Sequence, residues 1–272
     1  MHHSQRPELW DRIDGEFAGV VPEYNLHGDI NAGFWERLFS DFPDHQFLLH
    51  DTATDTVLGT GRTLPRTWDG TPEGLGTGLD ASIEAAFDDH DAGAAPDALC
   101  ALGIEIAPAH QGRGHSARLL AHMADMARTA GLSHVIVPVR PTWKDRYPLA
   151  PIERYASWTR ADGAPFDPWI RAQVRQGGAV SAAVAKSSRI TGTVAEWEAW
   201  TGLAFPDDGR YVFPGGLAPL DIDRTRDRGA YWEPCVWITH DVRERTASTP
   251  APSMLSTAGQ ATSNGSSVTM RI

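Results

Sequence analysis

The clearest pattern of apolar and polar positions lies in the middle of the chain. Residues 98–106 form a nearly continuous apolar run, which is typical of a buried strand. Pro108 ends the run, and a glycine-rich loop follows at 109–114. From 115 to 129, apolar side chains recur at helical spacing and predict an amphipathic helix. Residues 133–139 predict a second strand. This order, strand, loop, helix and strand, predicts a right-handed crossover and a parallel strand pair.

Weaker patterns predict the flanking elements. A long connection runs from 63 to 97, which is typical of a functional or mobile loop in a compact domain. Asp167 before Pro168, and Thr193 three residues before Glu196, are helix-start signals. The predicted helices are at 8–17, 34–39, 80–87, 151–158, 167–175 and 193–200, and the predicted strands at 46–50, 56–62, 211–213 and 231–240.

Domain organisation follows from composition. Residues 1–244 can bury a substantial core without disulfides or metals, so we expect one domain with an enlarged C-terminal half. Residues 245–272 are rich in Ser, Thr, Ala, Pro and Gly, and predict a disordered tail. No run approaches the roughly 20 apolar residues that span a bilayer, and the N-terminus lacks the apolar core of a signal peptide. We expect a cytoplasmic protein without a membrane partner.

The charge of the chain narrows its partners. Its net charge is −11, which argues against nucleic acid, because binding phosphates needs a basic face. Between Thr67 and Gly112 there is no Lys or Arg, while Asp and Glu recur. This segment is either ordinary solvated surface or an acidic mouth that attracts a cationic amine. Cys100 and Cys235 lie in apolar runs without a CxxC spacing, so we expect core thiols and no metal site.

The loop with the sequence Gln111-Gly112-Arg113-Gly114-His115-Ser116 carries the candidate chemistry. A glycine-rich turn between a strand and a helix directs backbone N–H groups, at the positive end of the helix dipole, toward an anion such as phosphate. Gly112 and Gly114 let an anion approach closely, Arg113 adds a cation and Ser116 adds a hydroxyl donor. The GxxxxGK[ST] mononucleotide pattern is absent, and the dinucleotide pattern GxGxxG is not completed.

This loop and its surroundings resemble the GCN5-related N-acetyltransferase superfamily. That family has a Gln/Arg-x-x-Gly-x-Gly/Ala loop between its fourth strand and third helix, and residues 111–116 match it with Ser in the last place. The resemblance covers about residues 99–139. It implies an α/β fold: a mixed, mostly antiparallel central sheet with a splayed parallel strand pair, flanked by helices. It also implies acetyl-CoA, or another acyl-CoA, as co-substrate.

The resemblance also implies roles for individual residues. The pyrophosphate of coenzyme A would bind the backbone amides of Gln111, Gly112, Arg113, Gly114, His115 and Ser116. The pantetheine arm would pair with Ile104 and Ile106. Glu105 is the candidate base, unless it is a solvent-side or salt-bridged strand residue. The family's usual acidic Tyr is not evident, and Tyr155 and Tyr147 are the alternatives.

The function expected from this resemblance is transfer of an acetyl group to an amine of a small molecule. Direct transfer is favoured because no well-supported nucleophile is evident; Cys235 is the candidate for a covalent route. Residues 142–147 are the predicted acceptor-contacting loop. A non-catalytic acyl-CoA-binding module stays open, as does an acyltransferase that uses a longer acyl group or an acyl-carrier protein. The oligomeric state is open too, with a homodimer as one option.

Overall fold

The computed structural model describes residues 1–243, so the tail predicted at 245–272 lies outside the described residues. The strands are β1 (Gln46–Asp51), β2 (Thr56–Arg66), β3 (Ala98–Ile106), β4 (His134–Val139), β5 (Ala179–Gly192), β6 (Gly209–Tyr211), β7 (Leu220–Asp223) and β8 (Arg228–Asp241). The α-helices are α1 (Ile13–Glu16), α2 (Asn31–Asp41), α3 (Leu79–Ala92), α4 (His115–Thr129), α5 (Ile152–Ala156), α6 (Pro168–Arg175) and α7 (Val194–Thr201). Short 3-10 helices are η1 (Pro7–Arg12), η2 (Glu23–Leu26), η3 (Pro43–His45), η4 (Glu73–Leu75), η5 (Pro108–His110) and η6 (Lys144–Arg146).

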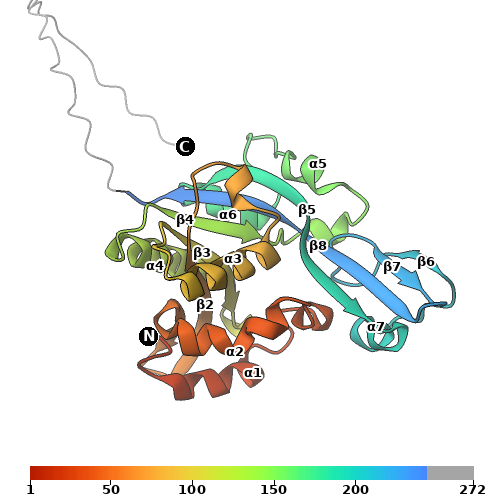
Figure 1. Cartoon of the computed structure of the whole chain (residues 1–272), viewed down its shortest axis with the longest axis horizontal. Coiled ribbons are helices and arrows are strands. Elements are labelled where there is room, and N and C mark those ends of the chain that lie inside the picture. Colours follow the sequence, from red (N-terminus) through yellow and green to blue (C-terminus); the bar gives the residue numbers. More distant parts are fainter. Residues whose placement is uncertain (244–272) are drawn as a thin grey trace, which may run out of the picture.

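All eight strands belong to one mixed sheet. Its order is β1-β2-β3-β4-β8-β7-β6, and β5 pairs with β8 off this path. The pairing of β3 with β4 is parallel, and the remaining pairs are antiparallel. Helices flank the sheet (Figure 1). The α/β fold with a mostly antiparallel sheet and one parallel pair, expected from the sequence, is confirmed.

The parallel pair is short because β3 and β4 separate. They pair only from Ala98 to Cys100 on β3 and from His134 to Ile136 on β4. Beyond these residues β3 continues alongside β2, while β4 continues alongside β8. Pro138 on β4 has no N–H to donate, so a proline is tolerated where the strand has lost one neighbour. The separation leaves a gap in the middle of the sheet.

Different elements cover the two faces of this central region. Helix α4 packs Leu119, Leu120 and Met123 onto one face, in a core that also contains Leu99 and Val135. On the opposite face the core contains Leu75, Cys100, Ile136, Cys235 and Trp237. The N-terminal helices α1 and α2 lie together on one side of the molecule, and β6, β7 and α7 form its far end on the long strand β8 (Figure 1).

Several strands differ from the sequence-based prediction, among them β7, which lies where no element was predicted. Strand β2 continues to Arg66, four residues past the predicted end, although Pro65 lies within it. Its pairing with β1 ends at Arg62, so this stretch has a free edge on which proline is tolerated. Strand β6 ends at Tyr211, where the predicted strand began. Strand β5 lies in a region for which no element was predicted.

The helices that carry recognisable start signals form as predicted. Asp167 caps α6 by accepting hydrogen bonds from the backbone N–H groups of Trp169 and Ile170, and Thr193 with Glu196 forms a capping box on α7. Helix α4 spans the predicted residues 115–129. No helix of residues 1–243 combines the length and apolar character that a membrane crossing requires.

Candidate active site

A cavity of about 640 Å³ opens where β3 and β4 separate. Its walls include both separated strands, part of β8 and β5, and the N-terminal segment 20–35. The lining on the α4 side includes Ile104, Ile106, Val137, Val139, Ser116 and Trp169. The lining on the opposite side includes Trp35, Arg62, Glu105, Arg140, Glu233 and Cys235. The gap in the sheet therefore gives one cavity whose lining comes from both sides of the sheet.

The 111–116 loop leads into the α4 side of this cavity. Gly112 and Gly114 have φ angles of +74° and +79°, which side-chain-bearing residues rarely adopt. Gly114 is the N-cap of α4 and no side chain caps that terminus. Among the described residues, no backbone N–H from Gly112 to Ser116 donates a hydrogen bond to the protein. These N–H groups, at the positive end of a 15-residue helix, are free to bind an anion.

The free edge of β3 provides a second binding feature. Ile104, Glu105 and Ile106 pair with β2 on one side, at Gly61, Thr60 and Gly59. On the side toward β4, no strand of the described chain pairs with residues 101–106. Backbone groups on this edge can therefore accept an extended ligand as an added strand. A bulge opposite the Arg62/Thr63 step also alters the register of β3 next to the gap.

Glu105 lies on the side of the sheet opposite α4, within an ion pair. Its Oε1 accepts a 2.8 Å hydrogen bond from Arg62 Nη1, and its Oε2 lies 3.4 Å from the hydroxyl of Thr60. The Arg62 guanidinium lies over the ring of Trp35, 5.0 Å from its centroid. Glu105 thus forms a salt bridge and also lines the cavity, so both interpretations of this residue stay open.

A second ion pair, which the sequence analysis missed, lies in the lining of the same cavity. Arg140 Nε pairs with Glu233, and Arg140 Nη2 donates to the hydroxyl of Tyr24 at 2.9 Å and to the carbonyl of Gly215 at 2.7 Å. Tyr231 also donates to Glu233. Burial favours the neutral guanidine, but Glu233, Tyr24 and Tyr231 together outweigh it and raise the pKa of Arg140.

The two tyrosines predicted as candidate acids lie outside the lining of the described cavity. Tyr155 is buried, and its hydroxyl donates to Asp167 at 2.8 Å. Burial and the Asp167 charge raise the pKa of Tyr155 well above its usual value. Tyr147 is exposed and its ring packs against Trp158 and Phe166. Tyr155 therefore has a clear structural role.

Cys235 lines the cavity but is poorly suited to nucleophilic attack. It is buried on β8, and burial raises the pKa of its thiol to about 12. At neutral pH the thiol therefore stays protonated, whereas a nucleophilic cysteine reacts as the thiolate. This geometry favours direct transfer over a covalent intermediate.

The predicted acceptor loop at 142–147 contacts the cavity only at its start. Thr142 is in the lining. Lys144 is buried, and its ammonium donates to the carbonyls of Tyr147 and Leu217 at 2.8 and 2.6 Å. Burial lowers the pKa of Lys144 to about 8. Lys144 thus ties this loop to the segment before β7 instead of facing a ligand.

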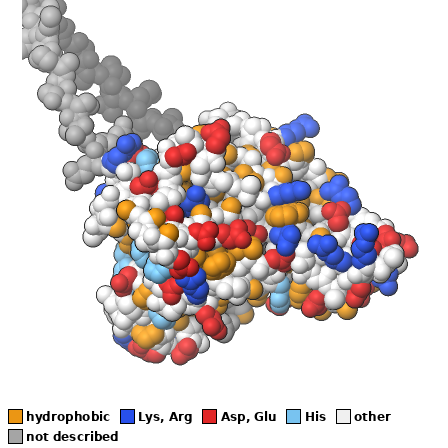
Figure 2. Space-filling model, viewed as in Figure 1, with side chains coloured by type: hydrophobic (Ala, Val, Ile, Leu, Met, Phe, Trp, Pro, Cys, Tyr) orange, Lys and Arg blue, Asp and Glu red, His pale blue; other side chains and the backbone are white. Residues whose placement is uncertain are grey.

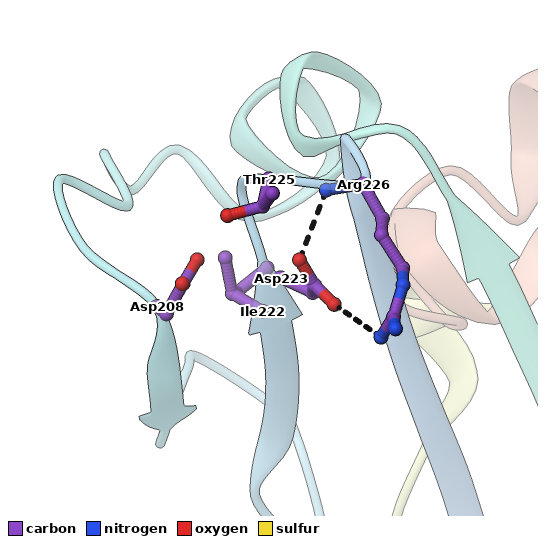
Figure 3. Close-up of a pocket in the computed structure, with 5 residues that line it drawn as sticks. All are labelled: Asp208, Ile222, Asp223, Thr225 and Arg226. Carbon is purple, nitrogen blue, oxygen red and sulfur yellow. Dashed lines mark hydrogen bonds and ion pairs between the residues drawn. The ribbon is translucent and has the colours of Figure 1, made fainter.

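Charged side chains are unevenly distributed over the surface, and a second hollow lies outside the cavity described above. Acidic side chains gather across the middle of one face, over the region of α3, whereas basic ones gather over the end that carries β7 (Figure 2). A hollow of about 400 Å³ lies at that end, lined by Asp208, Ile222, Asp223, Thr225 and Arg226 (Figure 3). Its one cation is held by Asp223 at 2.9 Å. Residues 1–243 hold no group of three His, Cys, Asp or Glu side chains suited to a metal ion.

Comparison with known proteins agrees with this geometry. The curated protein "Arginine N-acetyltransferase avaD" of Aspergillus versicolor is 24% identical over 269 residues, which cover 87% of this chain and 91% of that protein. The loading GNATL domain of CurA from Lyngbya majuscula is similar in structure, with a TM-score of 0.56, 16% identity, and coverage of 90% of this chain and 96% of that one. The GphF GNAT-like decarboxylase, solved with isobutyryl-CoA, gives a TM-score of 0.55, 16% identity, and coverage of 88% and 97%. No protein-family model matches the chain.

The chain is similar in sequence to a curated N-acetyltransferase and in fold to GNAT-like proteins, as its resemblance to the GCN5-related N-acetyltransferase superfamily implies. The separated parallel pair, the glycine loop and the relatives agree on this point. The expectation of an acyltransferase of the N-acetyltransferase type is confirmed at the level of the superfamily. The roles of individual site residues stay predictions.

Some residues at this cavity could not be recognised as site residues from the sequence. Arg62, Arg140 and Glu233 come from β2, the end of β4 and β8, and only the folded sheet brings them to one cavity. Arg140 did offer one sign, because a charged residue that ends an apolar parallel strand, directly before a proline, is a candidate for a site. Tyr24 offered none, because one tyrosine in an irregular N-terminal segment has no distinguishing pattern.

Proposed function

We propose that the chain transfers an acetyl group from acetyl-CoA directly to the amine of a small molecule. The observation that carries the proposal is the gap between β3 and β4. At this gap an uncapped helix N-terminus, a free strand edge and a cavity that reaches Glu105 meet. Each suits one part of the reaction: the pyrophosphate, the pantetheine arm and the acceptor amine.

The thioester would enter from the α4 side. Its pyrophosphate binds the free N–H groups of residues 112–116. The pantetheine arm lies along the free edge of β3 at Ile104 and Ile106, which directs the acetyl carbonyl into the gap. A backbone N–H of this edge can donate to the oxygen that becomes negative when the amine attacks.

The amine would approach from the side of Glu105. An ammonium group must lose a proton before it attacks, and the Glu105 carboxylate is the base candidate in the lining. Arg62 and Thr60 hold this carboxylate in place. The acidic surface near α3 can draw a cationic amine toward the cavity.

The departing coenzyme A thiolate needs little assistance. A thiol has a pKa of about 8.5, so the thiolate is a good leaving group near neutral pH and can take its proton from water. We therefore assign no tyrosine to this step. This choice agrees with the position of Tyr155, whose hydroxyl is committed to Asp167.

The relatives support a small amine as the acceptor. The curated relative is named for acetylation of arginine. The bound acyl-CoA in the solved decarboxylase is isobutyryl-CoA, so a longer acyl group is the second candidate. A cavity of about 640 Å³ is large enough for either acyl group together with a small acceptor.

The test is release of free coenzyme A thiol from acetyl-CoA, isobutyryl-CoA and an acyl-carrier-bound acetyl group, each with a panel of amines. Amine-dependent thiol release that is fastest with acetyl-CoA supports the proposal. If thiol release is fastest from isobutyryl-CoA or from the acyl carrier, that compound replaces acetyl-CoA as the proposed acyl donor. Binding of acyl-CoA without release in any combination would leave a binding module.

A further inference from the structure

One donor in the cavity has no partner among residues 1–243. Of the Arg140 guanidinium, Nε is bound to Glu233 and Nη2 to Tyr24 and Gly215. Nη1 donates no hydrogen bond to any described residue, and 32% of the Arg140 side chain is exposed where it lines the cavity. A positively charged donor is therefore presented, in a fixed orientation, to whatever occupies this end.

Neighbouring residues bind Nε and Nη2 of Arg140 and so fix the orientation of its guanidinium. Glu233 is only 5% exposed, and both of its oxygens are already occupied, by Arg140 on one side and by Tyr231 and Tyr24 on the other. The ring of Tyr24 packs edge-on against Tyr231, which limits movement of both hydroxyls. The guanidinium is thus oriented before any ligand arrives.

We infer that Arg140 binds a carboxylate of the acceptor, so that the acceptor is an amino acid rather than a simple amine. This inference rests on the proposed function. Arg140 and Glu105 line the same cavity, so one molecule can place its amine at Glu105 and its carboxylate at Arg140. Asn25 and Thr142 are also in the lining and can bond the remaining polar atoms.

The chemistry of this wall favours a carboxylate over a neutral group. Most of the lining is apolar, and a charge-assisted hydrogen bond gains strength where water is displaced. Glu233 already balances one unit of charge, so the site suits a single carboxylate better than a phosphate with two charges. Arg62, the other cation of the lining, has only 9% of its side chain exposed, against 32% for Arg140.

The test compares two acceptors that differ only in the carboxylate, arginine and agmatine, on the wild type and on Arg140→Gln. We expect the wild type to show a kcat/KM for arginine at least about tenfold above that for agmatine, as one charge-assisted hydrogen bond allows. Arg140→Gln should remove this difference by lowering the value for arginine at least about tenfold more than the value for agmatine. Equal use of both acceptors by the wild type, or an equal loss for both in the variant, overturns the inference.

Two further variants separate binding from folding. Tyr24→Phe disturbs the same network without removing the guanidinium, so it should keep the preference for arginine. Arg140→Lys keeps the positive charge and should keep part of the preference. If Arg140→Gln does not fold, as judged by thermal unfolding, a reduced preference in Arg140→Lys with full retention in Tyr24→Phe still supports the subsite. Retention in both Arg140→Lys and Tyr24→Phe, at wild-type level, opposes it.

A binding assay that needs no turnover distinguishes failure of the carboxylate subsite from failure of the proposed acetyl transfer. Trp35 and Trp169 line the cavity and report on its occupancy by fluorescence. Quenching by arginine but not by agmatine, lost in Arg140→Gln, supports the carboxylate subsite even when no thiol is released. Quenching by both or by neither overturns it, whatever the thiol assay shows.

Discussion

At the scale of single residues, the cavity depends on two carboxylate–guanidinium pairs, in each of which one partner has a second role. Glu105 is held by Arg62 and is the base candidate; Arg140 is held by Glu233 and presents a free donor. Removing one partner of such a pair leaves the other charge unbalanced, so a substitution here changes more than one contact. Conservative replacements are therefore the informative ones.

Glu105→Gln tests the base most directly. The amide keeps the size of the side chain but cannot take a proton, so we expect kcat to fall by about 10²–10⁴, the usual contribution of a general base. The dissociation constant for acetyl-CoA should stay unchanged. Steady-state kinetics and calorimetry measure the two quantities. The matched control is Glu84→Gln on the exposed face of α3, which should retain wild-type turnover. Wild-type turnover in Glu105→Gln would remove Glu105 from the mechanism.

Residue patterns along the sequence predicted the glycine loop but not the ion pairs. Gly112 and Gly114 were recognisable because a strand, two glycines and a helix follow one another locally, and both glycines do adopt positive φ. Arg62, Arg140 and Glu233 are brought together by strand pairing across the sheet, and local pattern does not encode such long-range contacts. Tyr155 was predicted for its position in the chain, whereas its hydroxyl is turned toward Asp167.

At the scale of elements, the quality of the prediction follows the strength of the local signal. Helix α4 has an apolar stripe and a glycine at each end, and its bounds were predicted correctly. Strand β5 was missed because its Ala- and Ser-rich sequence has little alternation, and bulges at Val180/Ala182 and Val184/Ser188 break what there is. It forms because β8 offers a long partner, which is a tertiary effect.

Tyr155→Phe distinguishes a structural tyrosine from a catalytic one. The loss of the hydroxyl leaves buried Asp167, the N-cap of α6, with one donor fewer, so we expect the free energy of unfolding to fall by about 1–2 kcal/mol. Denaturant unfolding measures this change. The kcat should remain at the wild-type level. A large drop in kcat without loss of stability would restore Tyr155 as the acid. Tyr147→Phe, on an exposed ring, provides the comparison for both measurements.

At the scale of the whole molecule, the separation of β3 and β4 is the feature that gives a continuous sheet a functional gap. Helix α4 packs on one face of the sheet and the N-terminal segment lines the cavity on the other, so the gap is bordered from both sides. Its position could be predicted from the family resemblance. The covering by residues 20–35 could not, because short irregular segments carry no periodic signal.

The stability of the described fold should depend on histidines in the interior. Burial lowers the pKa of His240, which is bonded to Gln173 at 2.8 Å, and of half-buried His45. As the pH falls below about 6.5, the unfolded chain binds these protons before the folded chain does, so stability decreases toward pH 5. Thermal unfolding between pH 8 and pH 5 measures this slope. His240→Gln should make the slope shallower; an unchanged slope would assign the acid sensitivity to other groups.

The central claim is that the 111–116 loop binds the pyrophosphate of an acyl-CoA, and calorimetric titration with acetyl-CoA tests it. The variants are Gly114→Trp and, at the other end of the same helix, Gly131→Trp. Both glycines have positive φ, +79° and +74°, and open space around them, so the two substitutions impose similar strain. We expect the wild type and Gly131→Trp to bind acetyl-CoA at micromolar levels and Gly114→Trp not to bind. Equal binding by all three proteins, or no binding by the wild type to acetyl-CoA or to longer acyl-CoAs, would contradict the account.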